Sequence, residues 1–179
     1  MGGMPHGMHH RTGGRGQPTR RQRRREQPHV IPERTQVLVR GLVGAAQHNG
    51  REGSIAGYDD ASSRYEVTLS ESDDVLRIKG ENLLQLPSCE VTGMQSRTEL
   101  NGERARVTGF DEERGRYHVS LNGMMVALQP ANRILPEATR ARVVGLVSAA
   151  QWNGRVGKVL SFEREKRRYL VQLTDEQQL

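Results

Sequence analysis

Every second residue is apolar in three short segments of the chain. In the clearest segment, Tyr65, Val67 and Leu69 alternate with two polar residues. A period of two predicts a β-strand with one buried face and one solvent-exposed face. The same pattern returns at residues 117–121 and at residues 169–173, so we expect three strands of the same kind.

These segments belong to an internal repeat with an interval of 52 residues. Other positions share that interval: Gly41, Gly93 and Gly145; Asn49-Gly50, Asn101-Gly102 and Asn153-Gly154; and Tyr58, Phe110 and Phe162. Six of the seven aromatic residues fall in just two columns of this register. Self-similarity at a fixed period is the signature of a repeat architecture, so the chain is predicted to contain three related units.

Each unit predicts about four or five short strands joined by tight turns. In the second unit, Asn122-Gly123 between apolar strands is a strong hairpin signal, because both central positions of such a turn need φ > 0. Units of this size and pattern favour small barrels. We therefore predict an all-β protein of tandem small barrels at residues 30–87, 88–137 and 138–179, the last one incomplete, after a tail at residues 1–29.

The glycines and apolar residues that open the units resemble the start of SH3-like barrels of the KOW and Tudor-like type. The residues that carry this resemblance are Val39, Gly41, Gly50, Gly53 and Ile55, then Val143, Gly145, Gly154, Gly157 and Val159. The second unit departs from the pattern, with Ala105 at the place of Gly53. The units are also similar to repeats in uncharacterised algal and protist proteins. The resemblance covers roughly residues 34–179 and implies binding of peptides, modified tails, RNA, or ribosomal and transcription partners, rather than catalysis.

Composition limits the classes of protein that the chain can represent. Hydrophobic residues make up 34% of the 179 residues, which is lean for one large α/β enzyme core. The single cysteine excludes an internal disulfide framework and suits a reducing compartment. The sequence has neither an apolar run long enough to span a membrane nor a recognisable secretory signal. We expect an intracellular protein of the cytoplasm or nucleus, with an organelle not excluded.

The net charge of +6 resides in the N-terminal tail, because residues 1–30 hold seven arginines and one acidic residue, and the remainder is neutral. The tail is too poor in apolar residues to form a core and is expected to be disordered. Its basic run is Arg20, Arg21, Arg23, Arg24 and Arg25. This run fits nuclear import or binding to the phosphates of a nucleic acid, and it equally fits a solubilising tail.

Two groups of residues are candidates for binding. The position before each Asn-Gly pair is variable, holding His48, Leu100 and Trp152, and a large side chain in such a loop is either a binding anchor or a cap on the barrel core. The third unit is locally basic at Arg164, Lys166, Arg167 and Arg168, which with the tail forms the predicted nucleic-acid-binding set or else a solvated face.

Catalysis is not expected, because no nucleophile, metalloprotease, P-loop or dinucleotide motif is present. Cys89 and His118 are not linked by any catalytic spacing. We predict no catalytic residues, no metal site and no cofactor. The primary hypothesis is a non-enzymatic adaptor or scaffold that binds protein partners, and the alternative is an RNA- or ribosome-associated protein.

The third unit stops soon after its third strand, whereas residues 30–35 repeat the pattern of residues 134–139. Three interpretations remain open at this stage. Residues 30–35 could complete the third unit, another chain could complete it, or the unit could be the cut end of a longer array. The oligomeric state is left open with them.

Overall fold

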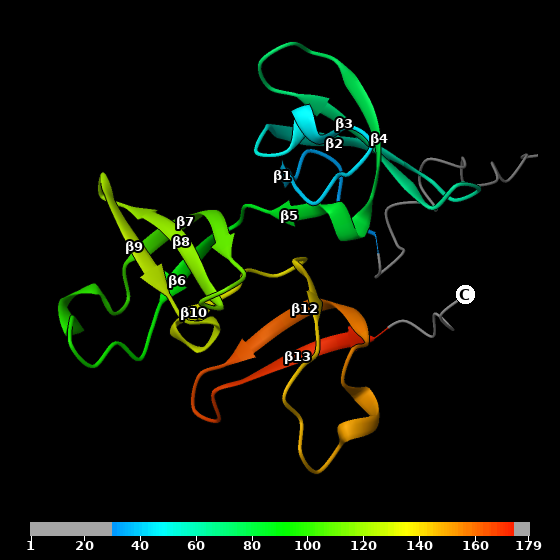
Figure 1. Cartoon of the computed structure of the whole chain (residues 1–179). Helices are drawn as coiled ribbons and strands as arrows, with labels where there is room; N and C mark the ends of the chain where they lie inside the picture. Colours follow the sequence, from blue (N-terminus) through cyan, green and yellow to red (C-terminus); the bar gives the residue numbers. More distant parts are fainter. Residues whose placement is uncertain (1–29, 174–179) are drawn as a thin grey trace, which may run out of the picture.

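The computed structural model describes residues 30–173 and consists of three antiparallel sheets with five single-turn 3-10 helices. Figure 1 shows the three sheets as separate units. The prediction of an all-β protein of small barrel-like repeats is therefore confirmed. The disorder predicted for residues 1–29 lies outside the described residues, as do Arg20, Arg21, Arg23, Arg24 and Arg25.

The first two repeats have the same five-stranded architecture. The first contains β1 (Gln36–Val39), β2 (Glu52–Asp59), β3 (Arg64–Leu69), β4 (Val75–Lys79) and β5 (Leu83–Gln85), in the order β4-β3-β2-β1-β5. The second contains β6 (Ser88–Val91), β7 (Arg104–Asp111), β8 (Arg116–Leu121), β9 (Met124–Leu128) and β10 (Arg133–Ile134), in the order β10-β6-β7-β8-β9. In both, the last strand returns to pair with the first, so the sheet curls around one small core.

The described part of the third repeat has three strands. They are β11 (Arg140–Arg142), β12 (Val156–Glu163) and β13 (Arg168–Leu173), in the order β11-β12-β13. Counterparts of β4 and β5 are absent from this repeat within residues 30–173.

Single-turn 3-10 helices occupy equivalent places. One lies in the long loop after the first strand of each repeat: η1 (Ala46–His48), η3 (Thr98–Leu100) and η5 (Ala150–Trp152). Another precedes the last strand of the first two repeats: η2 (Gly80–Asn82) and η4 (Pro130–Asn132). Each long loop ends at a glycine with φ between 85° and 89°, a conformation that glycine adopts without steric cost.

Turn chemistry and strand register follow the sequence pattern closely. The β8–β9 turn has φ of 49° at Asn122 and 80° at Gly123, as the two-residue hairpin requires. The three alternating segments all lie in strands, namely β3, β8 and β13. We call their apolar residues the ridge of each repeat: Tyr65, Val67 and Leu69; Tyr117, Val119 and Leu121; and Tyr169, Val171 and Leu173. The second strand of each repeat carries a bulge at the same place, at residues 56, 108 and 160.

The departure of Ala105 from the glycine pattern has a local explanation. At Gly53, a Cβ atom would lie 2.5 Å from the backbone oxygen of Thr68, which no side chain tolerates without a shift. In the second repeat, the paired part of β7 and β8 begins one residue later, at Arg106 and Ser120, so Ala105 lies just outside it.

Each of the first two repeats has its own hydrophobic core. The first core includes Ile31, which precedes β1 and is almost fully buried. The N–H of Ile31 donates to the hydroxyl of Tyr65 at 3.1 Å, and the N–H of Ile55 donates to the carbonyl of Thr35 at 3.0 Å. Residues 30–35 therefore complete the first repeat, and the interpretation that places them on the third repeat is wrong.

Polar contacts join the repeats to one another. Arg40 in the first repeat pairs with Glu112 in the second at 2.8 Å, and the Gln85 side chain of the first repeat binds the backbone of Arg140 in the third. The first repeat therefore contacts both the second and the third, so the repeats do not form a simple line.

Candidate functional site

The side chains that form the core in the first two repeats are partly uncovered in the third. Val67 and Val119 are fully buried, whereas the equivalent Val171 is only half-buried. The same difference separates Leu69 from Leu173. Among the described apolar side chains of the third repeat, that of Val159 alone is fully buried. The third repeat therefore presents apolar surface that its sister repeats hide.

Within residues 30–173, β13 differs from β3 and β8 in having one neighbouring strand instead of two. In the first repeat, β4 covers β3 with Ile78 opposite Tyr65 and Leu76 opposite Val67. In the second, Leu128 and Val126 of β9 take the same places on β8. Among residues 30–173, β13 pairs only with β12, and no strand of that part of the chain pairs with its outer edge. Such an edge is a template for another strand.

The opposite edge of this sheet, along β11, is not equivalent. The Gln85 amide donates to the carbonyl of Arg140 at 2.7 Å and accepts from its N–H at 3.2 Å. A side chain of the first repeat therefore already satisfies backbone groups of this edge. The open edge available to a partner is that of β13.

The outer face of the third repeat is also unusually apolar. Leu170 of β13 is 61% exposed, and Leu160 at the bulge of β12 is 38% exposed. The repeat interval aligns Leu170 with Glu66 and His118, and Leu160 with Ala56 and Thr108. An apolar pair has thus replaced small or polar residues here, on a face that is normally solvent-exposed.

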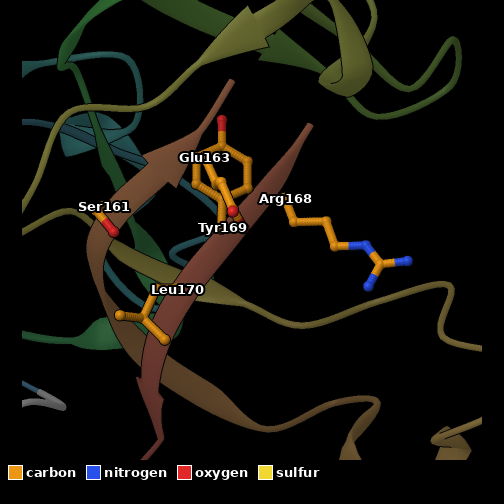
Figure 2. A pocket seen from close by; sticks show the side chains of 5 residues that line it. All are labelled: Ser161, Glu163, Arg168, Tyr169 and Leu170. Carbon is orange, nitrogen blue, oxygen red and sulfur yellow. The ribbon is translucent and has the colours of Figure 1, made fainter. Parts of the chain in front are cut away.

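A shallow hollow of about 490 Å³ lies against this face and the neighbouring hairpin end (Figure 2). It is lined by Ser161, Glu163, Arg168, Tyr169 and Leu170. Figure 2 shows Arg168 extending from β13 on the side away from β12. Arg168 is exposed and forms no ion pair with any of residues 30–173. The hollow therefore combines Leu170 and the Tyr169 ring with the carboxylate of Glu163, which pairs with Lys166, and the guanidinium of Arg168, which has no ion pair among residues 30–173.

The long loops that carry the predicted binding anchors are rigidly closed. In each, an asparagine binds the backbone of the residue seven positions earlier through both side-chain atoms: Asn49 with Leu42, Asn101 with Met94 and Asn153 with Leu146, at 2.8–3.1 Å. These bonds fix the 3-10 turn that ends at the anchor position. The predicted anchors are therefore held in place by the same device in all three repeats.

The three anchor side chains nevertheless occupy different environments. Trp152 is 42% exposed, with the guanidinium of Arg155 at 5.9 Å from its ring centroid. Leu100 is 5% exposed and belongs to the core of the second repeat. His48 is half-buried, and its Nδ1 has no hydrogen-bond partner. Trp152 is the anchor that offers most surface to a partner.

Most of the predicted nucleic-acid-binding residues of the third repeat have intramolecular neighbours. Arg164 forms a two-pronged ion pair with Glu90 of the second repeat, at 2.6 and 2.7 Å. This hydrogen bonding lowers the pKa of the Glu90 carboxyl and raises that of Arg164. Lys166 contacts Glu163 at 2.7 Å.

The guanidinium of Arg167 lies beside Gly93 of the second repeat. Its distance from the position that a Cβ atom would take on Gly93 is 2.9 Å. Within the described residues, neither Arg167 nor Arg168 forms an ion pair, and Arg168 is the one that lines the hollow. The basic set is therefore partly a means of packing two repeats together.

A buried polar cluster lies where the second and third repeats meet. The Tyr169 hydroxyl donates to the carbonyl of Arg133 at 3.0 Å and accepts from the N–H of Leu135 at 2.9 Å. The Arg133 guanidinium stacks 3.3 Å from the ring centroid of Tyr117, and burial lowers its pKa. Burial also raises the pKa of the nearby Cys89 thiol, which keeps it protonated at neutral pH and a poor nucleophile. These contacts indicate that the cluster packs the second repeat against the third.

Within residues 30–173, no group of three or more His, Cys, Asp or Glu side chains is placed to hold a metal ion. Nor does that part of the chain contain a helix of the length and apolarity needed to cross a bilayer.

Sequence reasoning missed the two exposed leucines of the third repeat. The signal was present in the repeat alignment, because each leucine stands in a column that is otherwise small or polar. The partial exposure of Val171 accompanies the absence of a fourth strand of this repeat within residues 30–173. The sequence matches no protein-family model, and no curated protein is significantly similar to it.

Proposed function

We propose that this protein is a non-enzymatic adaptor that binds protein partners, and that its third repeat is the main binding surface. The observation that carries the proposal is the contrast between closed and open copies of one fold. Two repeats cover their ridge with a fourth strand, and within residues 30–173 the third repeat has none and also carries two exposed leucines. Exposed apolar side chains gathered on one sheet support an interaction site.

The finer identity that we propose for the repeats is the SH3-like barrel of the KOW and Tudor-like type. Its support is local: Gly41 and Gly50 both adopt positive φ, as do Gly145 and Gly154, on either side of a loop between two apolar strands. These are the glycines on which the resemblance rests. Modules of this type imply binding, and function must be argued from the site rather than from the fold.

The RNA-binding alternative draws less support from the body of the protein. Residues 31–179 have no net charge, and Arg164 and Lys166 already face carboxylates. Phosphate binding depends on cations that are free to replace counterions. The alternative now depends chiefly on the N-terminal arginines, whose contribution is separable by deletion.

The test uses the full chain and two matched variants on nuclease-treated native extract. The first variant, Leu160→Thr with Leu170→His, gives the third repeat the residues of the second. The control, Val43→Gln, removes an equally apolar exposed side chain from a loop of the first repeat and also takes its residue from the second. Because both variants use residues the fold already accepts, both are expected to fold.

We expect the Leu160→Thr, Leu170→His variant to lose protein partners that the Val43→Gln variant keeps. A partner counts only when its purified form rebinds the purified chain. If both variants recover the same protein partners, the third repeat is not the binding site. Partners that vanish on nuclease treatment, or on deletion of residues 1–29, would favour the RNA-binding alternative.

A further inference from the structure

We infer that the β13 edge accepts an extended segment of another protein, which adds to the sheet as an antiparallel strand with three consecutive aliphatic residues followed by an acidic one. This inference rests on the proposed function and specifies its partner. The occupant is defined by what covers the equivalent edge in the sister repeats and by how β13 differs from β3 and β8.

The backbone of the first repeat shows how the strand would bind. The N–H of Leu69 donates to the carbonyl of Asp74 at 2.9 Å, so odd-numbered residues of β3 point their N–H groups toward β4. The equivalent donors in the third repeat are Tyr169, Val171 and Leu173. Antiparallel partners exchange bonds at every second residue, so partner residues opposite Tyr169 and Val171 would point their own N–H groups at β13.

The inner side chains of the occupant follow from the same register. Tyr65 and Tyr117 face Ile78 and Leu128, and the valines that follow face Leu76 and Val126. Both positions are aliphatic in both repeats. A strand that covers Tyr169 and Val171 therefore needs aliphatic residues at two alternate positions.

The outer side chain between them should be aliphatic as well. In the first repeat this place belongs to Arg77, which lies 3.8 Å from Glu66 on β3. In the third repeat Leu170 replaces that glutamate. A charged residue opposite Leu170 would lose its partner, whereas an aliphatic one would cover exposed apolar surface.

The last position of the strand lies opposite Arg168. In the first repeat, Lys79 faces the equivalent Arg64, whose guanidinium donates to the carbonyl of Arg77. Arg168 is exposed and has no ion pair among residues 30–173, so an acidic residue opposite it gains a charge-assisted hydrogen bond.

Among residues 30–173, the strands that cover the equivalent edges of the sister repeats match the β13 edge less well than such a segment does. The strands β4 and β9 place arginine and alanine at the outer position, and neither is followed by an acid. A second copy of β13 paired about Leu170 would set glutamine against Arg168. Charge complementarity therefore favours a heterologous segment over a second copy.

The test measures fluorescence anisotropy of short labelled peptides with the full chain. The designed peptide KTLVIEG places leucine, valine and isoleucine opposite Val171, Leu170 and Tyr169, with glutamate opposite Arg168. The control KTLEIVG has the same composition but exchanges the valine and the glutamate. We expect the designed peptide to bind at least about tenfold more tightly, the equivalent of about 1.4 kcal/mol.

Peptides with a single N-methyl group distinguish strand pairing from nonspecific apolar adhesion. A methyl on the isoleucine nitrogen blocks an N–H that points at β13, whereas a methyl on the valine nitrogen replaces one that points to solvent. We expect the first to weaken binding about tenfold or more and the second by no more than about threefold. Equal effects of the two methyl groups would overturn strand addition.

A charge swap provides the matched protein variant. Leu170→Glu restores the residue of the first repeat, so this variant should prefer KTLRIEG, with arginine opposite the new glutamate, over KTLVIEG. The wild-type chain should have the opposite preference. Gain of binding by the variant shows that it is folded, and an unchanged preference would contradict the assigned register.

Two further outcomes separate this inference from the proposed function. If no peptide binds while the binding of purified partners still depends on Leu160 and Leu170, strand addition is wrong and the proposed protein-binding function is retained. If sedimentation shows a dimer that Leu170→Glu dissolves, a second copy occupies the edge and the inference is wrong. If the binding of no protein partner depends on the two leucines, the proposed function of the third repeat is itself wrong.

Discussion

The same valine-to-alanine substitution should have unequal effects in a closed and an open repeat. Val67 is fully buried between strands of the first repeat, and Val171 is its half-buried equivalent in the third. Each substitution removes the equivalent of two methylene groups. We expect Val67→Ala to lower the free energy of opening of its repeat by about 2–3 kcal/mol, from a transfer contribution of about 0.8 kcal/mol per methylene and the cavity left behind.

Val171→Ala should cost less than about 1 kcal/mol. Part of the Val171 side chain is already in contact with water, and an incompletely covered site leaves a less enclosed cavity. Native-state hydrogen exchange is the suitable assay, because it reports the stability of each repeat separately. The matched reporters are the N–H groups of Ile55 and Val159, which bind equivalent carbonyls at 3.0 and 2.9 Å.

Exchange at Ile55 should accelerate about thirtyfold or more in Val67→Ala, and exchange at Val159 about fivefold or less in Val171→Ala. The designed strand peptide should enlarge the second effect, because a bound strand would bury Val171. Equal losses in the two variants without peptide would refute the reasoning, since they would mean that the third core is closed in solution.

Three further predictions concern single contacts. Gly53→Ala should destabilise the first repeat by about 1–3 kcal/mol through overlap with the backbone of β3, measured by urea unfolding, whereas a neutral result would mean that the strands separate freely. Asn153→Ala should loosen its loop by removing two hydrogen bonds, seen as a fall in the fluorescence anisotropy of Trp152; unchanged anisotropy would show that the loop is held by other contacts. The pKa of Glu90 is lowered in the folded chain, so the stability it provides with Arg164 is present above the unfolded pKa and is lost as pH falls through the folded pKa; Glu90→Gln should flatten this acid dependence in a pH series of unfolding curves.

The sequence was sufficient to predict the elements whose determinants are local. The alternation at Tyr65, Val67 and Leu69 predicted a strand, and Asn122-Gly123 predicted a two-residue turn, because each depends on residues close along the chain. The same is true of the repeat interval, which organised the whole fold.

Contacts between repeats could not be predicted in this way. The pairing of Glu90 with Arg164 joins residues 74 positions apart, and the basic run that contains Arg164 indicated a surface for nucleic acid rather than a junction between repeats. The Gln85 side chain on the backbone of Arg140 likewise depends on the placement of whole repeats in space. Periodicity carries no information on which faces of neighbouring units meet.

The asparagine loops also affect how the protein ages. Asparagine followed by glycine is prone to deamidation, which begins when the glycine nitrogen attacks the side-chain amide carbon. In the three long loops that amide is held at both atoms, and the glycine N–H donates to a valine carbonyl at 2.8 Å, in Gly50, Gly102 and Gly154 alike. The fold thus shields three labile sites from conversion to aspartate or isoaspartate. Asn122-Gly123, exposed at a hairpin tip, lacks this shield, and chemical damage to the described part of the chain should begin there.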